Sequence, residues 1–356
     1  MSDVQINIVG RAGHIQLARP KALNAMTIDM VTNMADALRS WVDDDNVHHV
    51  IITSSESRAF CAGGDVRQAV SVIDQNPSEG ATPYFKAEYG LDMCLASFPK
   101  PVTSLVEGVV MGGGLGVARL SDRMVISSDI KMAMPETAIG LFPDVGASLF
   151  LRRAPLACAL MMGMTGTMIG AGDALAWNLA DIHCHAADFD RLFEQLTSCE
   201  TDSDIQTLLA EFHQPAPLAH FAEQEALIAD IFLQDTIHDI LQAASVHKQA
   251  GGYADWSEQL LHRCPMSITC FWHMMTKEAV PQTMIEAIDR DYHLARKLTA
   301  RPDFREGVRA VLVDKDNKPA WQPATLEEVT DDMMSALFNF DAMTPLPERG
   351  FTPKKL

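Results

Sequence analysis

The chain opens with alternating apolar and polar residues and continues with runs whose spacing indicates helices and buried strands. Residues 4–17 hold two alternating runs, V-Q-I-N-I-V and H-I-Q-L-A, separated by glycines, and they predict a β-hairpin. Thr27 is a good N-cap, and the apolar residues after it recur at spacings of four, four and three, which predicts one helix face: Met30, Met34, Leu38 and Trp41. An acidic turn follows, and then the continuous apolar run H-V-I-I-T-S at 49–54, which is typical of a buried strand.

A strand followed by a glycine-bearing loop recurs three times. The loops are R-A-F-C-A-G-G-D-V-R at 58–67, E-G-V-V-M-G-G-G-L-G-V-A at 107–118 and M-A-M-P-E-T-A-I-G-L-F-P-D-V-G at 132–146. Successive units of about 45 residues predict an α/β fold in which ββα repeats stack as a spiral, rather than an open doubly wound sheet.

Helical patterns dominate the chain beyond about residue 190. The runs S-D-I-Q-T-L-L-A-E-F and Q-E-A-L-I-A-D-I-F-L are amphipathic, and a helix near 282–300 carries one apolar face: Ile285, Ile288, Tyr292, Ala295 and Leu298. We therefore expect a spiral core over residues 1–190 and a helical C-terminal region over 191–356. No low-complexity linker separates the two, so we expect the second to pack on the first as a helical layer or an oligomer surface.

Charge narrows the classes of partner. The 356 residues carry a formal net charge of −19, and a field of that size argues against nucleic acid and anionic membranes as partners. It leaves room for an anionic small ligand, because a few local cations or helix N-termini reverse the field at one site. The hydrophobic fraction of 47% supports a substantial core.

Seven scattered cysteines without a C-x-x-C pair are typical of a reducing compartment with free, buried thiols. The first residues lack a basic region followed by an apolar stretch, so we expect no signal peptide and a cytoplasmic protein. Residues 154–172 carry no charge, but Pro155 and four glycines interrupt them. A short buried helix at about 155–164 is therefore expected there instead of a membrane span.

Two carboxylates stand in an otherwise uncharged run, Met132–Gly146. Burying Glu136 and Asp144 in such surroundings costs free energy unless each is paired or hydrogen-bonded, which favours a functional role. The alternative is structural: one acid caps a helix after Pro135 and the other lies in a Pro-Asp turn.

Two glycine clusters, A-F-C-A-G-G-D and V-V-M-G-G-G-L-G, each follow a strand and open a predicted helix. Unpaired backbone N–H groups at two such helix starts form an oxyanion hole if they converge on one carbonyl oxygen. The alternative is that the glycines only permit close backbone packing. A phosphate-binding P-loop is excluded because no G-K-[ST] follows either cluster.

These two clusters, with the run P-E-T-A-I-G-L-F-P-D-V-G, resemble the crotonase (enoyl-CoA hydratase/isomerase) superfamily. Within it the chain is similar to the 3-hydroxyisobutyryl-CoA hydrolase group over about residues 5–340. The segment D-F-R-E-G-V-R-A-V-L-V-D-K-D-N-K-P-A-W at 303–321 is the part most specific to that group. The early segment R-P-K-A-L-N-A-M-T belongs to the same resemblance.

The resemblance implies that the backbone N–H groups of Ala62 and Gly113 hold the thioester oxygen and that Gly64 also lies against the substrate. Glu136 falls where crotonase-like hydratases keep one of two glutamates. Their other glutamate would fall at Gly116, where it is missing, and Asp144 replaces a residue that is commonly glycine in hydratases. This departure from the hydratase pair favours hydrolysis over hydration.

The segment Y-F-K-A-E-Y-G-L resembles the hydrolase pattern that puts Glu88 beside the hydroxyl of the acyl group; the alternative is an exposed helical charge. Glu136 would act as general base on water, or attack the thioester to give an acyl-enzyme anhydride. Asp144 would bind the substrate hydroxyl or share the protons. The sequence leaves both routes open.

Five further positions carry weaker signals. His183 and His185 alternate on one strand face, but no third ligand cluster accompanies them, so we expect no metal. Cys61 has no nearby histidine and is expected to be a small buried side chain. Arg19 and Lys21 are candidates for contacts with the phosphates of CoA.

The sequence therefore predicts hydrolysis of a short branched 3-hydroxyacyl-CoA, most specifically 3-hydroxyisobutyryl-CoA in valine degradation. We expect no cofactor, because CoA enters with the substrate, and a homo-oligomer is compatible with the helical region. Two rival functions remain. One is hydration or isomerisation of an enoyl-CoA on the same fold, and the other is non-catalytic binding of a CoA ester.

Overall fold

A computed structural model describes residues 2–77, 80–250, 255–340, 345–346 and 351. The alternating N-terminal runs form the predicted hairpin, in which β1 and β2 pair antiparallel over six residue pairs. The hairpin opens a six-stranded sheet whose other neighbouring strands are parallel. In spatial order these strands are β1 (Val4–Val9), β2 (Ala12–Leu17), β3 (His49–Ser54), β5 (Val102–Val106), β7 (Arg123–Ile126) and β9 (Ile182–His183).

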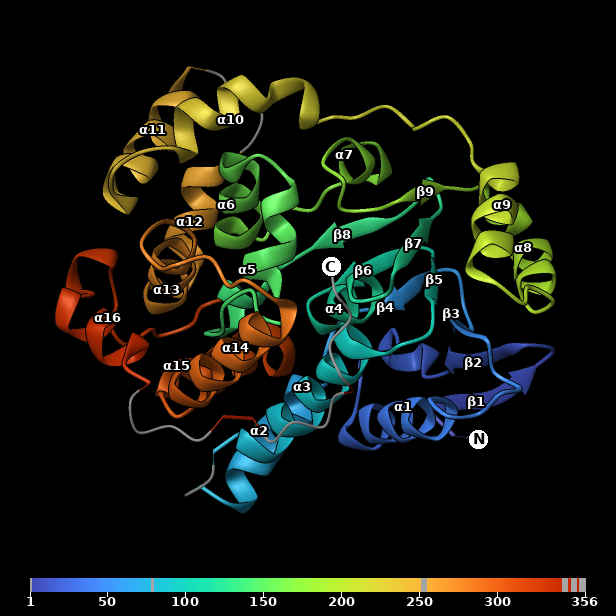
Figure 1. The fold of residues 1–356 in the computed structure, drawn as a ribbon. Coiled ribbons are helices and arrows are strands. Elements are labelled where there is room, and N and C mark those ends of the chain that lie inside the picture. Colours follow the sequence, from blue (N-terminus) through green and yellow to red (C-terminus); the bar gives the residue numbers. More distant parts are fainter. Residues whose placement is uncertain (1, 78–79, 251–254, 341–344, 347–350, 352–356) are drawn as a thin grey trace.

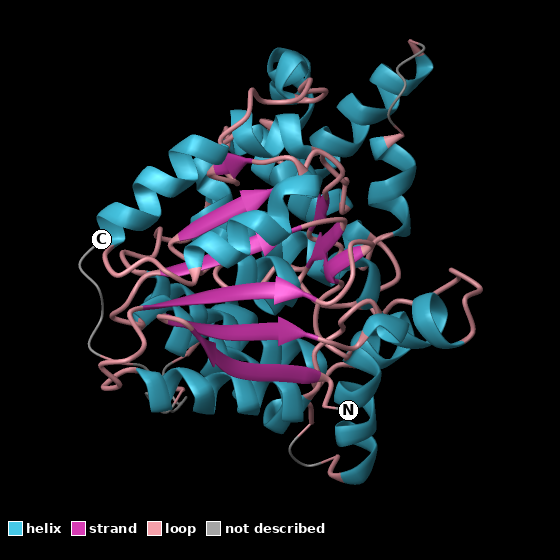
Figure 2. Cartoon of the chain, turned by 90° about the vertical axis from the view of Figure 1, so that its right-hand side faces the viewer, coloured by secondary structure: helices cyan, strands magenta, loops and turns pink. Residues whose placement is uncertain are grey.

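A second, three-stranded parallel sheet holds the strands between them: β4 (Ala59–Cys61), β6 (Val109–Met111) and β8 (Lys131–Ala133). Successive turns of the chain thus add one strand to each sheet in sequence order. This monotonic order is that of a spiral, whereas a doubly wound sheet reverses direction. The predicted α/β spiral is confirmed (Figure 1, Figure 2).

Helices of the spiral follow the strands: α1 (Ile28–Trp41), α2 (Val66–Gln75), α3 (Thr82–Ser97) and α4 (Gly113–Arg119). The first begins as predicted, with the Thr27 hydroxyl accepting the Met30 N–H at 3.2 Å. Short elements then complete this half: the 3-10 helices η1 (Pro20–Ala22), η2 (Glu136–Ile139) and η3 (Leu151–Arg153), with α5 (Ala147–Phe150), α6 (Leu156–Thr165) and α7 (Ala171–Ala176).

The uncharged stretch 154–172 is divided between α6 and α7, and the predicted short buried helix is confirmed as α6. Across the described parts of the chain, no helix has the length and apolar character needed to cross a bilayer. All seven cysteines are free and buried, as predicted.

Alternation along the strands divides the core in two. One face of the large sheet packs on α8 (Phe189–Leu196) and α9 (Asp202–Phe212), through residues such as Ile51, Leu105 and Val125. The other face joins the main core, to which α14 (Met284–Thr299) contributes Ile288, Tyr292 and Leu298 from the predicted apolar face. Residues from both sides of position 190 share this core, and the division there remains a prediction.

The remaining helices are α10 (Glu225–Phe232), α11 (Ile237–Gln249), α12 (Trp256–His262), α13 (Pro265–Thr276), α15 (Pro302–Val308) and α16 (Asp331–Phe338). Of these, α15 and α16 contact α14, whereas α10 and α12 contact α6. The shorter helical turns of the second half are η4 (Ala186–Asp188), η5 (Ala222–Gln224), the π-helical η6 (Arg309–Val313) and η7 (Leu326–Glu328). In Figure 1, α14 lies beside α3, and α15 packs on α2. These contacts bring residues far apart in sequence to one place.

Candidate active site

A cavity of about 730 Å³ opens beside the short parallel sheet, where the chain leaves β4, β6 and β8. Because these strands are parallel, the loops that follow them meet at one edge. The cavity is lined by all six residues predicted for catalysis, the oxyanion hole and substrate binding: Ala62, Gly64, Glu88, Gly113, Glu136 and Asp144. The structure therefore brings all of the predicted site residues together.

The first glycine loop contradicts one predicted role. The N–H of Ala62 donates to the carbonyl oxygen of Leu23 at 2.9 Å, so it cannot also bind a thioester oxygen. The N–H of Gly64 has no acceptor among the described residues. Met26 pairs with the positions on either side of Gly64, because its N–H donates to Gly63 and its carbonyl accepts from Asp65. In such a parallel bridge the N–H of Gly64 points away from Met26, which makes it the free donor of this loop.

The second glycine loop presents Gly113 as the first residue of α4, where a backbone N–H has no intrahelical acceptor. The preceding Gly112 has φ +51°, and a Cβ there would lie 2.5 Å from Oε1 of Glu136. The loops touch each other: a Cβ on Gly63 would lie 3.6 Å from the nitrogen of Gly113. Glycine is thus required for the close approach of both loops to each other and to Glu136.

Glu136 opens η2 and is buried, with 6% of its surface exposed. The N-cap of η2 is Pro135, where no side-chain capping hydrogen bond forms, so Glu136 is not the N-cap of this helix. Oε2 has no hydrogen-bond partner among the described residues. Burial raises the pKa of Glu136 well above its ordinary value, and the neighbouring Asp144 raises it further.

Asp144 is 3% exposed and accepts a hydrogen bond of 2.5 Å from the phenol of Tyr89. Burial raises the pKa of Asp144 to about 6, and the Tyr89 hydrogen bond opposes that rise. The backbone of Asp144 also forms the expected turn, since its carbonyl accepts the N–H of Ala147 at 2.8 Å. The backbone of Asp144 therefore lies in the expected turn, whereas its side chain faces the cavity.

Glu88 is 3% exposed in the middle of α3, so the alternative reading as an exposed helical charge is wrong. Its Oε1 lies against both glycine loops, 2.8 Å from a Cβ built on Gly64 and 2.3 Å from one built on Gly113. Burial raises its pKa well above the ordinary value, and Asp144 adds to the rise. Three buried carboxyl groups therefore share one cavity.

The position of the missing hydratase glutamate is filled by another side chain. A Cβ on Gly116 would lie 2.7 Å from both Cβ and Cγ2 of Val145. Val145 itself has φ +51°, an unusual conformation for a β-branched residue. Val145 thus occupies the space that the side chain of a larger residue at position 116 would need.

Arg19 and Lys21 differ in their surroundings. Arg19 forms ion pairs with Asp65 at 2.8 Å and Asp3 at 3.5 Å and so supports the first glycine loop. Lys21 is exposed at the cavity with two other basic side chains, Arg67 and Lys315. The predicted phosphate contact remains open for both, and the sequence reading missed Arg67 and Lys315.

The remaining candidates lie in structural positions. Cys61 is fully buried, its thiol contacts the carbonyl of Asn24 at 3.1 Å, and burial raises its pKa to about 12, which suits an inert side chain. His183 Nδ1 bonds to the carbonyl of Pro215 at 2.7 Å, and its ring lies 6.0 Å from that of His185. Among the described residues no cluster of three or more His, Cys, Asp or Glu could hold a metal ion.

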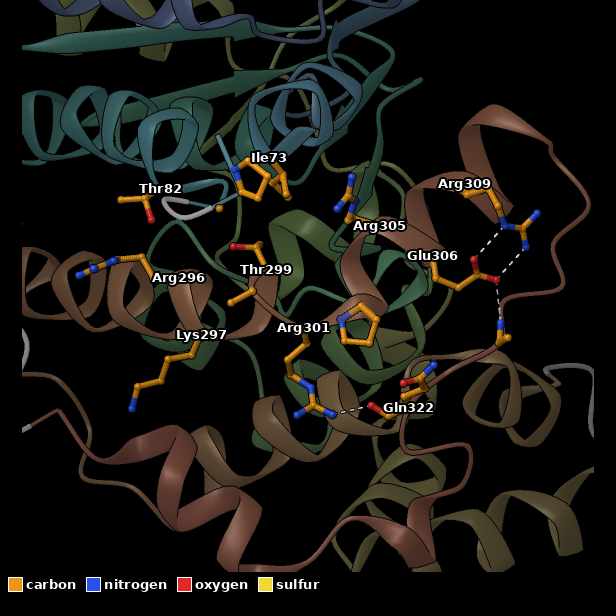
Figure 3. A pocket seen from close by; sticks show the side chains of 15 residues that line it. Ile73, Thr82, Arg296, Lys297, Thr299, Arg301, Arg305, Glu306, Arg309 and Gln322 are labelled. Atoms are coloured by element: carbon orange, nitrogen blue, oxygen red, sulfur yellow. Dashed lines mark hydrogen bonds and ion pairs between the residues drawn. The ribbon is translucent and has the colours of Figure 1, made fainter. Parts of the chain in front are cut away.

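A larger cavity of about 930 Å³ lies between α2, α14 and α15, away from these carboxyls (Figure 3). Five basic side chains line it: Arg296, Lys297, Arg301, Arg305 and Arg309. Four of them already have anionic or carbonyl partners. Arg309 bonds to Glu306, Asp314 and Asp316, Arg301 to Asp303, Arg305 to Asp74, and Lys297 to the carbonyl oxygens of Ala336 and Leu337. Volume alone therefore does not identify the reactive site.

The sequence reading also missed Tyr89, Asp92 and Asp291, which lie behind Asp144. The last two are 1% and 0% exposed, respectively. A signal existed for Asp92, since it follows Glu88 by one helical turn in an otherwise apolar helix. Asp291 comes from α14, and no local pattern connects it to residues near position 144.

Comparison with known proteins agrees with this geometry. Residues 12–338 match the family model described as enoyl-CoA hydratase/isomerase, and the chain belongs to this family. Relatives named "3-hydroxyisobutyryl-CoA hydrolase, mitochondrial" share 32% identity in Homo sapiens (94% of this chain, 88% of the relative) and 31% in Danio rerio (95% and 90%). The predicted family resemblance is confirmed.

Two solved structures have the same fold over nearly the whole chain. A carnitinyl-CoA dehydratase from Mycobacterium thermoresistibile superposes with a TM-score of 0.89 at 33% identity, covering 98% of this chain and 99% of that one. An enoyl-CoA hydratase from Rhodobacter sphaeroides 2.4.1 superposes with a TM-score of 0.86 at 32% identity, covering 95% and 97%. Their titles name two reactions that differ from hydrolysis, so the choice of reaction depends on the carboxyl groups of the site.

Proposed function

We propose that the protein hydrolyses the thioester of a short branched 3-hydroxyacyl-CoA, 3-hydroxyisobutyryl-CoA being the substrate named for its relatives. One observation carries the choice of reaction. Glu136 and Asp144 share a cavity with two glycine loops, while Val145 fills the position in which hydratases of the family would hold their second glutamate. That substrate belongs to valine degradation.

The glycine loops supply the oxyanion site in this proposal. The backbone N–H groups of Gly64 and Gly113 would hold the thioester oxygen as it gains negative charge, each contributing about 3 kcal/mol to transition-state stabilisation. Gly64 takes the role that the sequence reading assigned to Ala62, whose N–H is already used. At the mouth, Lys21, Arg67 and Lys315 would attract the phosphates of CoA.

The coupled carboxyl pair supplies the acid and the base. Two interacting carboxyls lose their protons in separate steps, so the pair carries one negative charge over an intermediate pH range. The ionised form takes a proton from water, or Glu136 attacks the thioester carbon itself; the remaining proton goes to the departing CoA thiolate. Water and thioester give carboxylic acid and free thiol, so the reaction as written requires no cofactor.

Glu88 would orient the acyl group. Its buried carboxyl lies against Gly64 and Gly113, close to where the carbonyl would bind. Burial raises its pKa and so stabilises the protonated form relative to the ionised one. A protonated carboxyl can both donate to and accept from a substrate hydroxyl. This contact is our reason for a 3-hydroxyacyl substrate.

The test is a comparison of two signals on matched substrates. Free thiol released from 3-hydroxyisobutyryl-CoA is measured beside the loss of enoyl absorbance from the corresponding enoyl-CoA. We expect thiol release without enoyl consumption. Enoyl consumption without thiol release would favour hydration or isomerisation, and tight binding with neither signal would favour a non-catalytic binder.

The two chemical routes are separated by trapping. If Glu136 forms an anhydride, hydroxylamine added during turnover converts its carboxyl to a hydroxamate, which peptide mass spectrometry detects. An unmodified Glu136 peptide under turnover favours activation of water. A cytoplasmic location and a homo-oligomer remain predictions, to be checked by fractionation of cells and by light scattering.

A further inference from the structure

Three ionisable side chains behind Asp144 are not used by the proposed chemistry: Tyr89, Asp92 and Asp291. The first two come from α3 and the third from α14, and all three are at most 1% exposed. A buried ionisable group that takes no part in a reaction costs stability unless it makes a specific contact. Two of these three groups contact the Asp144 loop directly.

Tyr89 provides the first contact. Its phenol donates to Oδ2 of Asp144 at 2.5 Å, and a donor to a carboxyl oxygen stabilises the ionised form. No side chain donates to Glu136 in the same way: its Oε2 is unpartnered among the described residues, and the hydrogen bond that lowers its pKa comes from its own backbone. The two carboxyls of the site are therefore unequal: Asp144 has a side-chain donor for its charge and Glu136 does not.

Asp291 provides the second contact. Its Oδ2 accepts the N–H of Gly146 at 2.8 Å, two residues after Asp144. Gly146 has φ +81°, so the hydrogen bond fixes a turn that other residues would strain. Burial raises the pKa of Asp291 to about 8, while Arg290 opposes that rise, so this carboxyl is mainly neutral at pH 7.

We propose that Tyr89 and Asp291 form a two-point clamp that positions Asp144 and selects it, rather than Glu136, as the ionised carboxyl of the site. The clamp joins α3 to α14, two helices that pack on each other from distant parts of the chain. Tyr89 and Asp291 are positioning residues in this account, and the inference rests on the proposed thioesterase function.

The other charged groups facing Asp144 do not supply this selection. Glu88 and Asp92 face it from α3 and Glu136 from η2, and each carboxylate would oppose the charge on Asp144. On α14, Arg290 is next to Asp291 and donates to the hydroxyl of Ser148 at 2.6 Å. The Tyr89 phenol is thus the direct side-chain donor to Asp144 among the described residues.

The test uses Tyr89→Phe, which removes one hydroxyl and keeps the ring. Without its donor, the pKa of Asp144 rises, so we expect the acid limb of kcat to move upward by about one pH unit. Near pH 6 the variant is then about fivefold slower, approaching tenfold below pH 5, and much of the loss is recovered above pH 8. An acid limb that superimposes on that of the wild-type protein would overturn the clamp.

A matched control comes from the same helix. Tyr84 is equally buried, but its phenol donates to the carbonyl of Met26 at 2.7 Å instead of to Asp144. Tyr84→Phe removes a hydroxyl of the same kind, and its acid limb is expected at the wild-type position whatever happens to kcat. An equal shift in both variants would mean that the effect comes from packing, and would contradict the clamp.

Asp291 is tested by a conservative and a disruptive substitution. Asp291→Asn keeps an oxygen for Gly146 and mimics the neutral carboxyl, so kcat should stay within about threefold of wild type. Asp291→Ala removes the acceptor, and we expect a larger fall in kcat with little change in KM. Equal kcat values in the two variants would contradict the second point of the clamp, provided that both show the wild-type circular dichroism spectrum.

A titration without turnover separates this inference from the proposed function. The side-chain carboxyl of Asp144 is followed by ¹³C NMR in aspartate-labelled protein, with Asp144→Asn to assign it. We expect a higher pKa in Tyr89→Phe than in wild type, even if no CoA ester is hydrolysed. Equal values in the two proteins would overturn the clamp, whereas absent thiol release by wild type would overturn the proposed function alone.

Discussion

The two large cavities of the protein differ in how their charges are matched. The smaller one holds Glu88, Glu136 and Asp144, and among the described residues none of these carboxyls forms an ion pair. The larger one is lined by basic side chains, most of which are paired with carboxylates or carbonyl oxygens. Arg309, for example, forms ion pairs with Glu306 and Asp314. Figure 3 shows the Glu306–Arg309 pair at the rim of that cavity.

This difference in charge pairing distinguishes a cavity that can carry a reaction from one whose charged groups stabilise the fold. Matched charges have ordinary protonation states and hold elements together, as Arg309 does for the turn after α15. Unmatched buried carboxyls have displaced pKa values and can exchange protons near neutral pH. In this fold the cavity with unmatched carboxyls is also the one beside the N–H groups of Gly64 and Gly113, which have no acceptor in the described part of the chain. For this reason we propose that the chemistry takes place in the smaller cavity.

The largest effect is expected for Glu136→Gln, which tests whether the smaller cavity is the reactive one. The amide can neither give its proton to the departing thiolate nor act as base or nucleophile, so we expect thiol release to fall by about 10²–10⁴-fold, with CoA-ester binding largely kept. Thiol release and calorimetric binding measure the two effects. Near-normal turnover would remove Glu136 from the mechanism.

The second prediction concerns Asp144→Asn, for which we expect a loss of about 10²-fold. In wild type the active form requires the ionised carboxylate, so activity should rise with pH through about 6 and fall as acid protonates Asp144. The asparagine variant should lose this acid limb. A limb retained near pH 6 would assign that ionisation to another group.

The third prediction concerns the missing hydratase acid. Gly116→Glu should destabilise the fold by about 1–3 kcal/mol, because its Cβ would overlap Val145. Adding Val145→Gly removes that clash and a β-branched residue at positive φ, so the double variant should regain part of the lost stability. Denaturant titrations of both variants, with Val145→Gly alone as the control, check this. Equal stability of the Gly116→Glu and double variants would show that Val145 does not fill the site.

The smallest effect is expected in the larger cavity. Glu306→Gln weakens a partly exposed contact with Arg309, at 2.8 Å, and should cost no more than about 1 kcal/mol of stability. Thiol release should be unchanged. A loss of activity comparable to that of Glu136→Gln would abolish the distinction between the two cavities.

Local patterns were sufficient for much of the fold. The cap at Thr27, the hairpin and the apolar face of α14 depend on residues close in sequence, and each was predicted. The spiral order followed from the repeated strand-and-loop units. Glu136, Asp144 and Gly113 could be singled out because their motifs are contiguous and resemble those of a known family, and the structure places all three at one cavity.

What the sequence could not supply depends on distant contacts. The N–H of Ala62 is unavailable because Leu23 accepts it, which no motif reveals. Asp291 reaches the Asp144 loop only because α14 packs on α3. The filling of the Gly116 position by Val145 is likewise a matter of tertiary packing.

The most direct test of the account is a side-by-side thiol-release assay of wild type, Glu136→Gln and Glu306→Gln with 3-hydroxyisobutyryl-CoA. The account predicts rapid release by wild type and Glu306→Gln, and release lowered by at least about 10²-fold in Glu136→Gln. Equal rates in the three proteins, or no release by wild type while enoyl-CoA is consumed, would contradict it.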